Sequence, residues 1–410
     1  MRYIIVIIIL VFISSGCQGF QTNESLMKPP APFFNIKEAI QAFVPSNATI
    51  LEANTGEFLD PFTIIDLDGN GTLEAILFYS GIKEGIVQGL LLEEINGKWE
   101  VAQTFEGDGN TLYELDFIDV TNDGLLDIIA GFSFTNQYFE RGLSVFHNSG
   151  NEIRNILNTS YTHKVLDDLN EDGVQDLVLF FLNEAHSWNE AFVYNYDNDE
   201  MLLIDAIPLR SYIMGYYNLL TGYVTEDLQK GIVFDIANGQ HSGYTNILLF
   251  DGISLTSVFN EEDEPNGKSF RIYSEDLNDD GIIEIGFPRV PDGYENQEEW
   301  FIPYLGSYYR WDGEVGLQFV AERYASFSLN YSFDFPWEWQ QNVTIEGSLN
   351  FQDVKFISTV DQSLLFDIYV VPVTEKEEKM EGKIELARTN HYVYYTTIDD
   401  KQLHKKFKLL

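Results

Sequence analysis

A nine-residue acidic loop recurs along the chain and constrains its fold more than any other feature. The loop begins with Asp, carries Asp or Asn at its fifth position and Gly at its sixth, and ends in an acid that opens an apolar stretch. The intact copies are DLDGNGTLE, DVTNDGLLD, DLNEDGVQD and DLNDDGIIE, starting at residues 66, 119, 168 and 276. Because four such copies do not arise by chance at similar intervals, the loop marks a repeated structural unit.

A damaged fifth copy lies between the third and fourth intact ones. It reads DLQKGIVFD over Asp227–Asp235, with Gln229 at the third position and Ile232 in place of the turn glycine. The five starts are separated by 53, 49, 59 and 49 residues (119−66, 168−119, 227−168 and 276−227). A period near fifty residues with several short strands per unit is typical of a β-propeller or a similar array.

Each unit also contains a predicted β-hairpin after its loop. The pairs Asn96-Gly97, Asp251-Gly252 and Asp312-Gly313 tolerate positive φ in tight turns between strands. Four strands in each of five units predict about five blades between Phe58 and Glu322. The Ile36–Phe43 stretch before them is the expected short helix.

The segment that follows the repeats has a different pattern. Residues 324–410 show alternating strands and a charged helix candidate, Glu375–Leu386. We therefore expect an all-β propeller over residues 35–323, followed by a small α+β domain over 324–410. An extra blade is the alternative for this last segment.

The N-terminus predicts export and a lipid anchor. Arg2 precedes an apolar run, Ile4–Ile13, which is too short for a membrane-spanning helix but typical of an export signal. Small residues then lead to Cys17, the only cysteine, and this pattern resembles the lipobox of bacterial lipoproteins, although Ser14 departs from the usual Leu. The resemblance implies that residues 1–16 are removed and that Cys17 is acylated, for example with palmitate. The alternative is an ordinary secretory signal.

The charge balance limits the partners of the exported chain. Removing residues 1–16 leaves 23 of the 24 basic residues against 65 acidic ones, a formal charge of −42. Such a surface repels nucleic acid and anionic polymers and attracts cations. We expect no nucleic-acid partner, contact with the membrane through lipid on Cys17, a flexible tether over residues 17–34, and a location on the outer side of a bacterial membrane.

The loops have the composition of calcium sites. Calcium takes six to eight oxygen ligands, and positions one, three, five and nine of each loop offer side chains while position seven offers a carbonyl. The candidate ligands are Asp66, Asp68, Asn70 and Glu74; Asp119, Thr121, Asp123 and Asp127; Asp168, Asn170, Asp172 and Asp176; and Asp276, Asn278, Asp280 and Glu284.

An EF-hand does not explain these loops. It requires a bidentate acid at position twelve and flanking helices, but position twelve is Leu77, Ala130, Leu179 or Phe287, and the flanks read as strands. An extracellular site held at ten times its dissociation constant stabilises the fold by roughly 1.4 kcal/mol, so four would supply about 5–6 kcal/mol. About four structural Ca²⁺ ions are therefore predicted.

On these motifs the chain resembles the FG-GAP/VCBS repeat family, the calcium-loop blades of integrin-α-like propellers. The likeness covers about two-thirds of the chain, without clear FG and GAP tags beside the loops. It implies a calcium-binding propeller whose partners bind on the face opposite the calcium loops.

Connectors expected on that opposite face supply the candidate ligand residues. Two of them, NEAHSWNE and ANGQHSGYT, pair His with Ser and an aromatic residue, a composition suited to a glycan or protein ligand. The alternative is that these aromatics only pack between blades. The candidates are His186, Trp188, Asn189, Asn238, His241, Tyr244 and Tyr138.

The predicted function is therefore a binding or scaffold module at the cell surface. Local signatures of an enzyme are missing: the sequence has no HExxH, no GxSxG and no phosphate-binding glycine loop. The alternative is a polysaccharide-active lyase or hydrolase on the same scaffold. His241, Tyr244 and Arg141 are then the candidates for acid–base catalysis.

Overall fold

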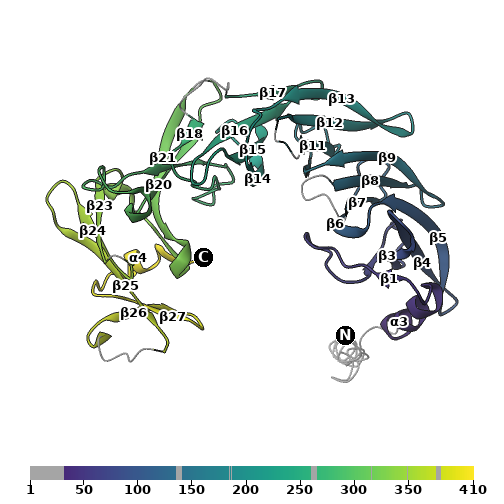
Figure 1. Cartoon of the computed structure of the whole chain (residues 1–410), viewed down its shortest axis with the longest axis horizontal. Helices are drawn as coiled ribbons and strands as arrows, with labels where there is room; N and C mark the ends of the chain where they lie inside the picture. The colour runs from purple at the N-terminus through teal and green to yellow at the C-terminus, as the bar shows by residue number, and fades with distance from the viewer. Residues whose placement is uncertain are drawn as a thin grey trace, which may run out of the picture. The chain divides into compact units, whose positions relative to one another are not determined.

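The computed structural model describes residues 32–134, 141–183, 185, 187–259, 266–314, 316–348, 350–374 and 380–410. The predicted export signal, Cys17 and most of the tether lie outside these residues. Antiparallel sheets dominate the described part (Figure 1), and the predicted all-β class is confirmed. The chain divides into two compact units, Met1–Ser160 and Tyr161–Leu410.

The first unit contains two sheets. One has the order β1-β3-β4-β5 with β2 on β3, and the other has the order β6-β7-β8-β9. The strands are β1 Thr49–Ile50, β2 Thr63–Ile65, β3 Glu74–Lys83, β4 Ile86–Ile95, β5 Lys98–Asp108, β6 Thr111–Ile118, β7 Asp127–Ser133, β8 Arg141–Asn148 and β9 Ile153–Tyr161.

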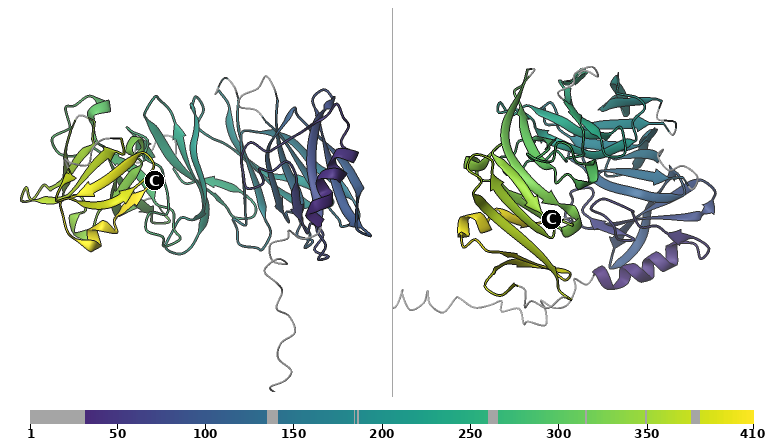
Figure 2. Two further views of the ribbon diagram at one scale, coloured as in Figure 1. Left: turned by 90° about the horizontal axis from the view of Figure 1, so that it is seen from below. Right: turned by 60° about the vertical axis from the view of Figure 1, so that its left-hand side comes forward.

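An aromatic core joins the two sheets of this unit. Phe105 of β5 and Phe146 of β8 have ring centroids 4.8 Å apart, and Phe78 of β3 packs edge-on against Phe132 of β7. Helix α3, Pro32–Phe43, lies on the other face of the first sheet (Figure 2), so both faces of that sheet are covered. The helix expected over Ile36–Phe43 is confirmed.

The second unit contains four sheets in chain order, with strand orders β10-β11-β12-β13, β14-β15-β16-β17 with β18 on β16, β19-β20-β21-β22-β28 and β23-β24-β25-β27-β26. The strands are β10 His163–Asp167, β11 Asp176–Leu182, β12 Asn189–Asp197, β13 Glu200–Pro208, β14 Gly215–Tyr223, β15 Lys230–Ala237, β16 Gly243–Phe250, β17 Leu255–Ser257, β18 Gly267–Lys268, β19 Ile285–Arg289, β20 Leu305–Trp311, β21 Leu317–Ser326, β22 Tyr331–Asp334, β23 Val343–Gly347, β24 Asp353–Ser358, β25 Leu364–Pro372, β26 Ile384–Arg388, β27 Tyr392–Thr396 and β28 Phe407–Leu409.

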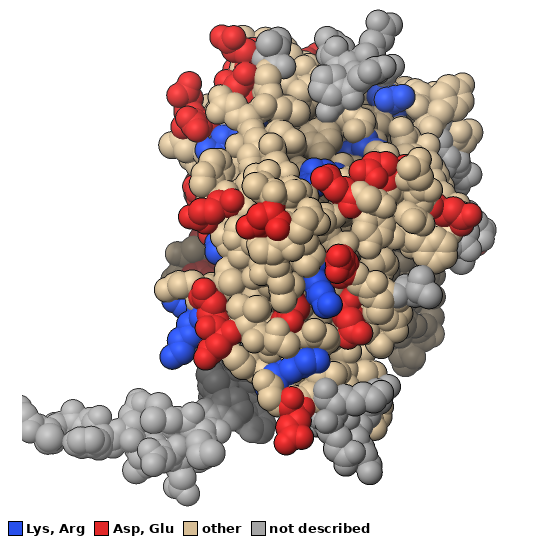
Figure 3. Space-filling view, turned by 90° about the vertical axis from the view of Figure 1, so that its left-hand side faces the viewer, with Lys and Arg blue, Asp and Glu red and all other residues tan. Residues whose placement is uncertain are grey.

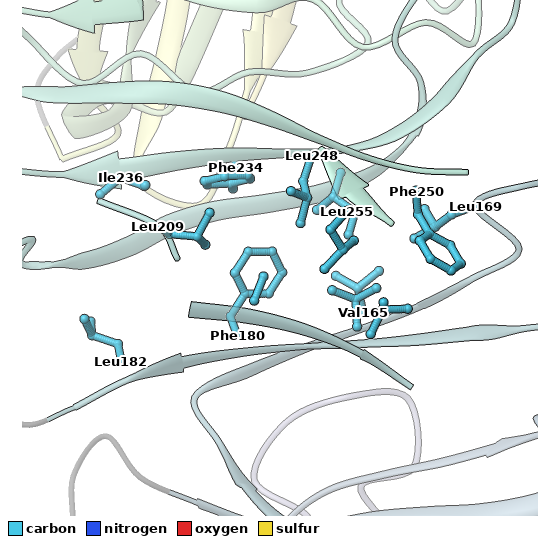
Figure 4. Packing of buried hydrophobic residues seen from close by; sticks show 14 of the residues in the cluster. Val165, Leu169, Phe180, Leu182, Leu209, Phe234, Ile236, Leu248, Phe250 and Leu255 are labelled. Carbon is cyan, nitrogen blue, oxygen red and sulfur yellow. The ribbon is translucent and has the colours of Figure 1, made fainter. Parts of the chain in front are cut away.

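Consecutive sheets of the second unit share apolar cores. Figure 4 shows Val165 and Phe180 of the sheet β10–β13 pointing toward Phe234 and Leu248 of the next sheet. Two further clusters join the sheet of β14–β18 to that of β19–β22, and that sheet to β23–β27. The period-two alternation along each strand places one set of apolar side chains on each sheet face, which allows this serial packing.

Five of the six sheets in the part that the structure describes contain four consecutive or nearly consecutive strands in the up-and-down order of propeller blades, whereas the last sheet has the order β23-β24-β25-β27-β26. The predicted hairpin turns are present, with positive φ at Asn96, Gly97, Gly252 and Gly313. The described residues contain six antiparallel sheets, where the repeat predicted about five blades and a C-terminal domain. The number of blades is therefore not confirmed.

The C-terminal segment is mainly a sheet. The helix expected over Glu375–Leu386 is wrong at its end, because residues 384–386 belong to β26 and pair with β27; residues 375–379 lie outside the described part. The short helix of this segment is α4, Lys401–His404, whose first turn is capped by Asp400. Short 3-10 turns occupy Glu299–Phe301, Phe327–Leu329 and Trp337–Trp339.

Charged residues are spread over the surface. On the face in Figure 3, Asp and Glu side chains are scattered among uncharged residues, with Lys and Arg between them. Among the described residues, no helix is long and apolar enough to cross a membrane.

A buried ion pair lies inside the sheet of β14–β18. Lys268 Nζ is 2.6 Å from Asp235 Oδ1, and both side chains are fully buried. Asp235 also accepts hydrogen bonds from Asn218 and from Ser274, while Lys268 donates to the Ile272 carbonyl. Burial lowers the pKa of Lys268, and the adjacent carboxylate opposes that shift.

Replacing Lys268 with Met should destabilise the protein by about 3–5 kcal/mol, because Asp235 would remain buried without its counter-charge. Urea unfolding at neutral pH measures the change. Lys355→Met, at an exposed lysine on β24, is the matched control and should alter stability by less than about 0.5 kcal/mol. Equal stability of the Lys268→Met and wild-type proteins would contradict this account of the pair.

Candidate functional site

The four intact loops share one backbone arrangement. The first Asp of each loop accepts a hydrogen bond from the N–H of the sixth-position glycine, at 2.8–3.0 Å. The side-chain oxygen at position five accepts from the N–H at position seven, at 2.7–2.9 Å. The glycines, Gly71, Gly124, Gly173 and Gly281, all have φ between 84° and 90°, which a larger residue adopts only with strain.

The ninth-position acid ties each loop to its sheet. Its carboxylate accepts the N–H of the second loop residue at 2.8–3.0 Å. These four acids, Glu74, Asp127, Asp176 and Glu284, are at most 4% exposed. Burial raises the pKa of each, to about 6 for Asp176, because the ionised form is poorly solvated. A cation beside these acids would offset that cost.

The first loop offers the clearest metal site. Asp66, Asp68 and Glu74 bring carboxylate oxygens within 4.8 Å of one another, and no other group of His, Cys, Asp and Glu in the described residues does so. One oxygen of Asp66 is buried without a hydrogen-bond partner. An oxygen-preferring divalent cation suits this donor set.

The residue on the neighbouring strand that lies opposite the ninth acid differs from loop to loop. The strand registers place Glu93 opposite Glu74, His147 opposite Asp127, and Asn195 opposite Asp176. His147 Nδ1 lies 3.0 Å from Asp127, and the Asn195 amide, with its nitrogen turned inward, donates to Asp176 at 3.1 Å. In the fourth intact loop, Arg310 takes this position and contacts Asp280 and Glu284.

The damaged copy is a different turn. The pairing Tyr223↔Lys230 closes a six-residue connection, Val224–Gln229, whereas Ile65↔Glu74 closes an eight-residue one. Lys230 thus stands where the other units have their ninth acid. The predicted damaged loop Asp227–Asp235 placed Asp235 at the ninth position. That prediction is wrong, because Asp235 lies within β15 and forms the buried pair with Lys268.

The predicted ligand residues have varied environments. Trp188 is half exposed and packs edge-on against Phe181. Asn189 is buried, donates to the Arg210 carbonyl and accepts from the Tyr216 hydroxyl. Tyr138 and His186 lie outside the described residues.

The connector between β15 and β16 contains two more predicted residues, Asn238 and His241, and a third, Tyr244, lies at the start of β16. Asn238 is exposed, and its N–H bonds to the Ser242 carbonyl. Tyr244 is 3% exposed, with the Arg210 guanidinium over its ring at 4.7 Å. His241 stacks on Phe270, with ring centroids 6.2 Å apart. Arg141, in the first unit, stacks over Tyr113 at 3.8 Å.

A cavity of about 550 Å³ lies in the second unit, among β14, β20, β21 and the segments before β19 and β20. This volume is within the range of small-molecule sites. Most of its lining is apolar or aromatic, and Tyr273 and Phe327 are 44% and 64% exposed. The aromatic lining residues are Phe270, Tyr273, Tyr304, Tyr308, Tyr324, Phe327 and Phe351.

A fixed carboxylate lies in the cavity wall. Both oxygens of Glu275 are 2.8 Å from Arg323 Nη1, and one accepts the Tyr308 hydroxyl at 2.9 Å. Arg323 is also bound by Asp334 at 2.5 Å. Burial and the nearby Glu275 carboxylate raise the pKa of Tyr308, so its hydroxyl remains a donor. These contacts hold the orientation of Glu275.

The cavity extends toward the connectors named by the sequence. Tyr304 belongs to the connector between β19 and β20, at the end of that sheet away from the loop Asp276–Glu284. It stacks on Phe270 at 4.5 Å, and Phe270 in turn meets His241. Of the ligand residues predicted from the sequence, His241 therefore lies beside the cavity. Glu275, Tyr304 and Arg323 were not predicted. The aromatic run FRIY at 270–273 was the available signal.

No protein-family model and no curated protein matches the chain. Among solved structures, the Dos1 propeller is similar at 9% identity and TM-score 0.30, over 82% of this chain and 77% of that one. The β-propeller domain of the Trilobed protease from Pyrococcus furiosus has 11% identity and TM-score 0.31, over 75% and 92%. A rhamnogalacturonan lyase from Bacillus licheniformis has 10% identity and TM-score 0.30, over 78% and 71%. At these scores none bears on the function of this chain.

Proposed function

We propose that this protein is an exported, calcium-stabilised binding module whose aromatic cavity takes a saccharide. The observation that carries the proposal is the cavity itself, where exposed ring faces surround a carboxylate held in place by Arg323 and Tyr308. Rigid aromatic anchors with a few oriented polar groups are typical of ligand sites.

The lining chemistry favours a sugar over a purely apolar ligand. The C–H face of a pyranose packs on rings such as Tyr273, Phe327 and Tyr304, while its hydroxyls donate to a carboxylate. Glu275 remains 37% exposed although Arg323 is bound to it, so one side of the acid is open to such a donor. Ser326 and Ser328 also line the cavity.

Calcium is proposed as a structural ion of the loops. In the first loop Asp66, Asp68, Asn70 and Glu74 would hold it, and the corresponding residues of the second and third loops have the same backbone arrangement. The ion would supply positive charge to carboxylates that otherwise repel one another. The chain's own contribution is to fix those oxygens by hydrogen bonds to the loop backbone.

Millimolar calcium should raise the melting temperature above that in chelator by about 3–6 °C for each occupied site in a unit of this size. Differential scanning calorimetry in calcium and in EGTA measures the shift, with magnesium as the control for ionic effects. Identical melting temperatures in calcium and EGTA would rule out the structural ion.

Saccharide binding should depend on the cavity residues. An oligosaccharide array selects a ligand, and calorimetry with that oligosaccharide then compares variants. Tyr304→Ala and Glu275→Gln should each weaken binding at least tenfold, because they remove a stacking surface and a charged acceptor. Trp188→Ala, a half-exposed aromatic outside the cavity, is the matched control and should bind as wild type.

The opposite pattern would reject this site: binding lost in Trp188→Ala and kept in Tyr304→Ala. The same samples also test the enzymatic alternative. Release of reducing or unsaturated sugar ends that stops in His241→Ala would replace the binding-module proposal.

Membrane attachment is proposed to occur through lipid on Cys17, on the outer side of a bacterial membrane. The support is the apolar run followed by small residues and the single cysteine. Cys17→Ser should abolish palmitate labelling and move the protein from the membrane to the soluble exported fraction. A serine variant that is still labelled and membrane-bound would exclude this anchor.

A further inference from the structure

In the loop Asp276–Glu284 an arginine stands where a metal ion would bind. We infer that Arg310 replaces calcium in this loop, so that the native protein holds this unit together without a metal. The inference rests on the proposed calcium role of the other loops, and it reduces the number of calcium loops from the four predicted by sequence.

The contacts of Arg310 place its charge among the candidate ligands. It lies on β20, and the register Ile285↔Tyr309 places it opposite Glu284. Its Nη2 is 2.9 Å from Glu284 and is also hydrogen-bonded to Asp280, the ninth and fifth loop positions. A single guanidinium thus bridges two carboxylates that a calcium ion would otherwise join.

Burial makes this charge difficult to displace. The Arg310 side chain is 12% exposed and the Glu284 side chain is fully buried. Glu226, in the shortened turn of the preceding unit, approaches Nη1 at 3.3 Å. A divalent cation entering the loop would be repelled by the nearby guanidinium in a poorly solvated site. The two carboxylates that it would need as ligands are already bound to Arg310.

The other intact loops lack a fixed cation at this position. It is occupied by an acid in the first loop, Glu93, and by an amide in the third, Asn195. The histidine of the second loop, His147, lies 3.0 Å from Asp127 and 3.8 Å from Asp123, but it is a cation only when it is protonated, whereas the guanidinium of Arg310 is always charged. The arginine at this position therefore distinguishes the loop Asp276–Glu284 from the loops proposed to bind calcium.

The preceding unit supplies independent support. Its turn is too short for the metal motif, and the residue that replaces the ninth acid is Lys230. Its Nζ lies 2.8 Å from Asp167, the residue just before the third loop. Lys230 therefore replaces the ninth acid of its unit, whereas Arg310 lies opposite a ninth acid that is retained, and in both units the basic side chain is paired with a carboxylate.

Calcium counting on the full-length protein in detergent tests the inference. Isothermal titration with CaCl₂, after chelator treatment and dialysis, gives the number of ions bound. Asp276→Asn should leave that number unchanged, whereas Asp66→Asn, the same position in the first loop, should lower it by one. One ion fewer in Asp276→Asn would overturn the inference.

Arg310 itself provides the second arm. Arg310→Ala should gain one calcium ion, and Arg310→Ala combined with Asp276→Asn should lose that ion again. Arg310→Lys, which keeps a positive charge, is the control and should gain none. A count that does not rise in folded Arg310→Ala would show that the arginine does not exclude the ion.

Two outcomes separate this inference from the calcium proposal. A wild-type protein that binds no calcium, with Asp66→Asn unchanged, would reject calcium at the first loop. A gained ion in Arg310→Ala would still support the replacement. If Arg310→Ala does not fold, Asp276→Asn decides the question, because Asp276 binds the backbone of its own loop.

Discussion

Each unit with an intact acidic loop depends on the hydrogen bond between the buried ninth-position acid and the backbone of that loop. The acid is the residue that precedes or opens the strand after the loop. Its carboxylate fixes the loop to the sheet by accepting a backbone N–H, and its burial raises the pKa of the group. Burying a carboxylate without a positive partner costs free energy, so the acid of each unit must be paired with a metal ion or with a polar or basic side chain. The residue on the adjacent strand decides which of these partners is available.

The acidic loops and the longer connectors lie at opposite ends of the sheets that contain them. The intact acidic loops lie at one end of four sheets, while connectors such as that between β19 and β20 emerge at the other end. Loop chemistry can therefore be uniform while connectors differ in length and composition. Tyr304 of the aromatic cavity comes from such a connector, whereas Glu275 immediately precedes the loop Asp276–Glu284 of the same sheet.

Much of the fold follows from local sequence, because loop spacing and strand alternation are short-range patterns. The hairpins, the helix before the repeats and the sheet class were predictable for this reason. The C-terminal strand β26 was not, since its pairing with β27 overrides a charged, helix-like composition. The site was harder still: Glu275, Arg323 and Tyr304 meet only after sheets pack, and Lys230 matched no motif until strand register revealed its position.

The two sheets that form most of the cavity, β14–β18 and β19–β22, contain carboxylates paired with Lys268 and Arg310. These cations are covalently part of the chain, so their local concentration does not change with the surroundings. Under the proposed metal assignments and the proposed export, calcium depletion would destabilise the units of the first three intact loops and leave the Lys268 and Arg310 pairs of the cavity's sheets unchanged. The proposed ligand binding in the cavity would then depend less on the calcium concentration than the stability of the calcium-loop units does.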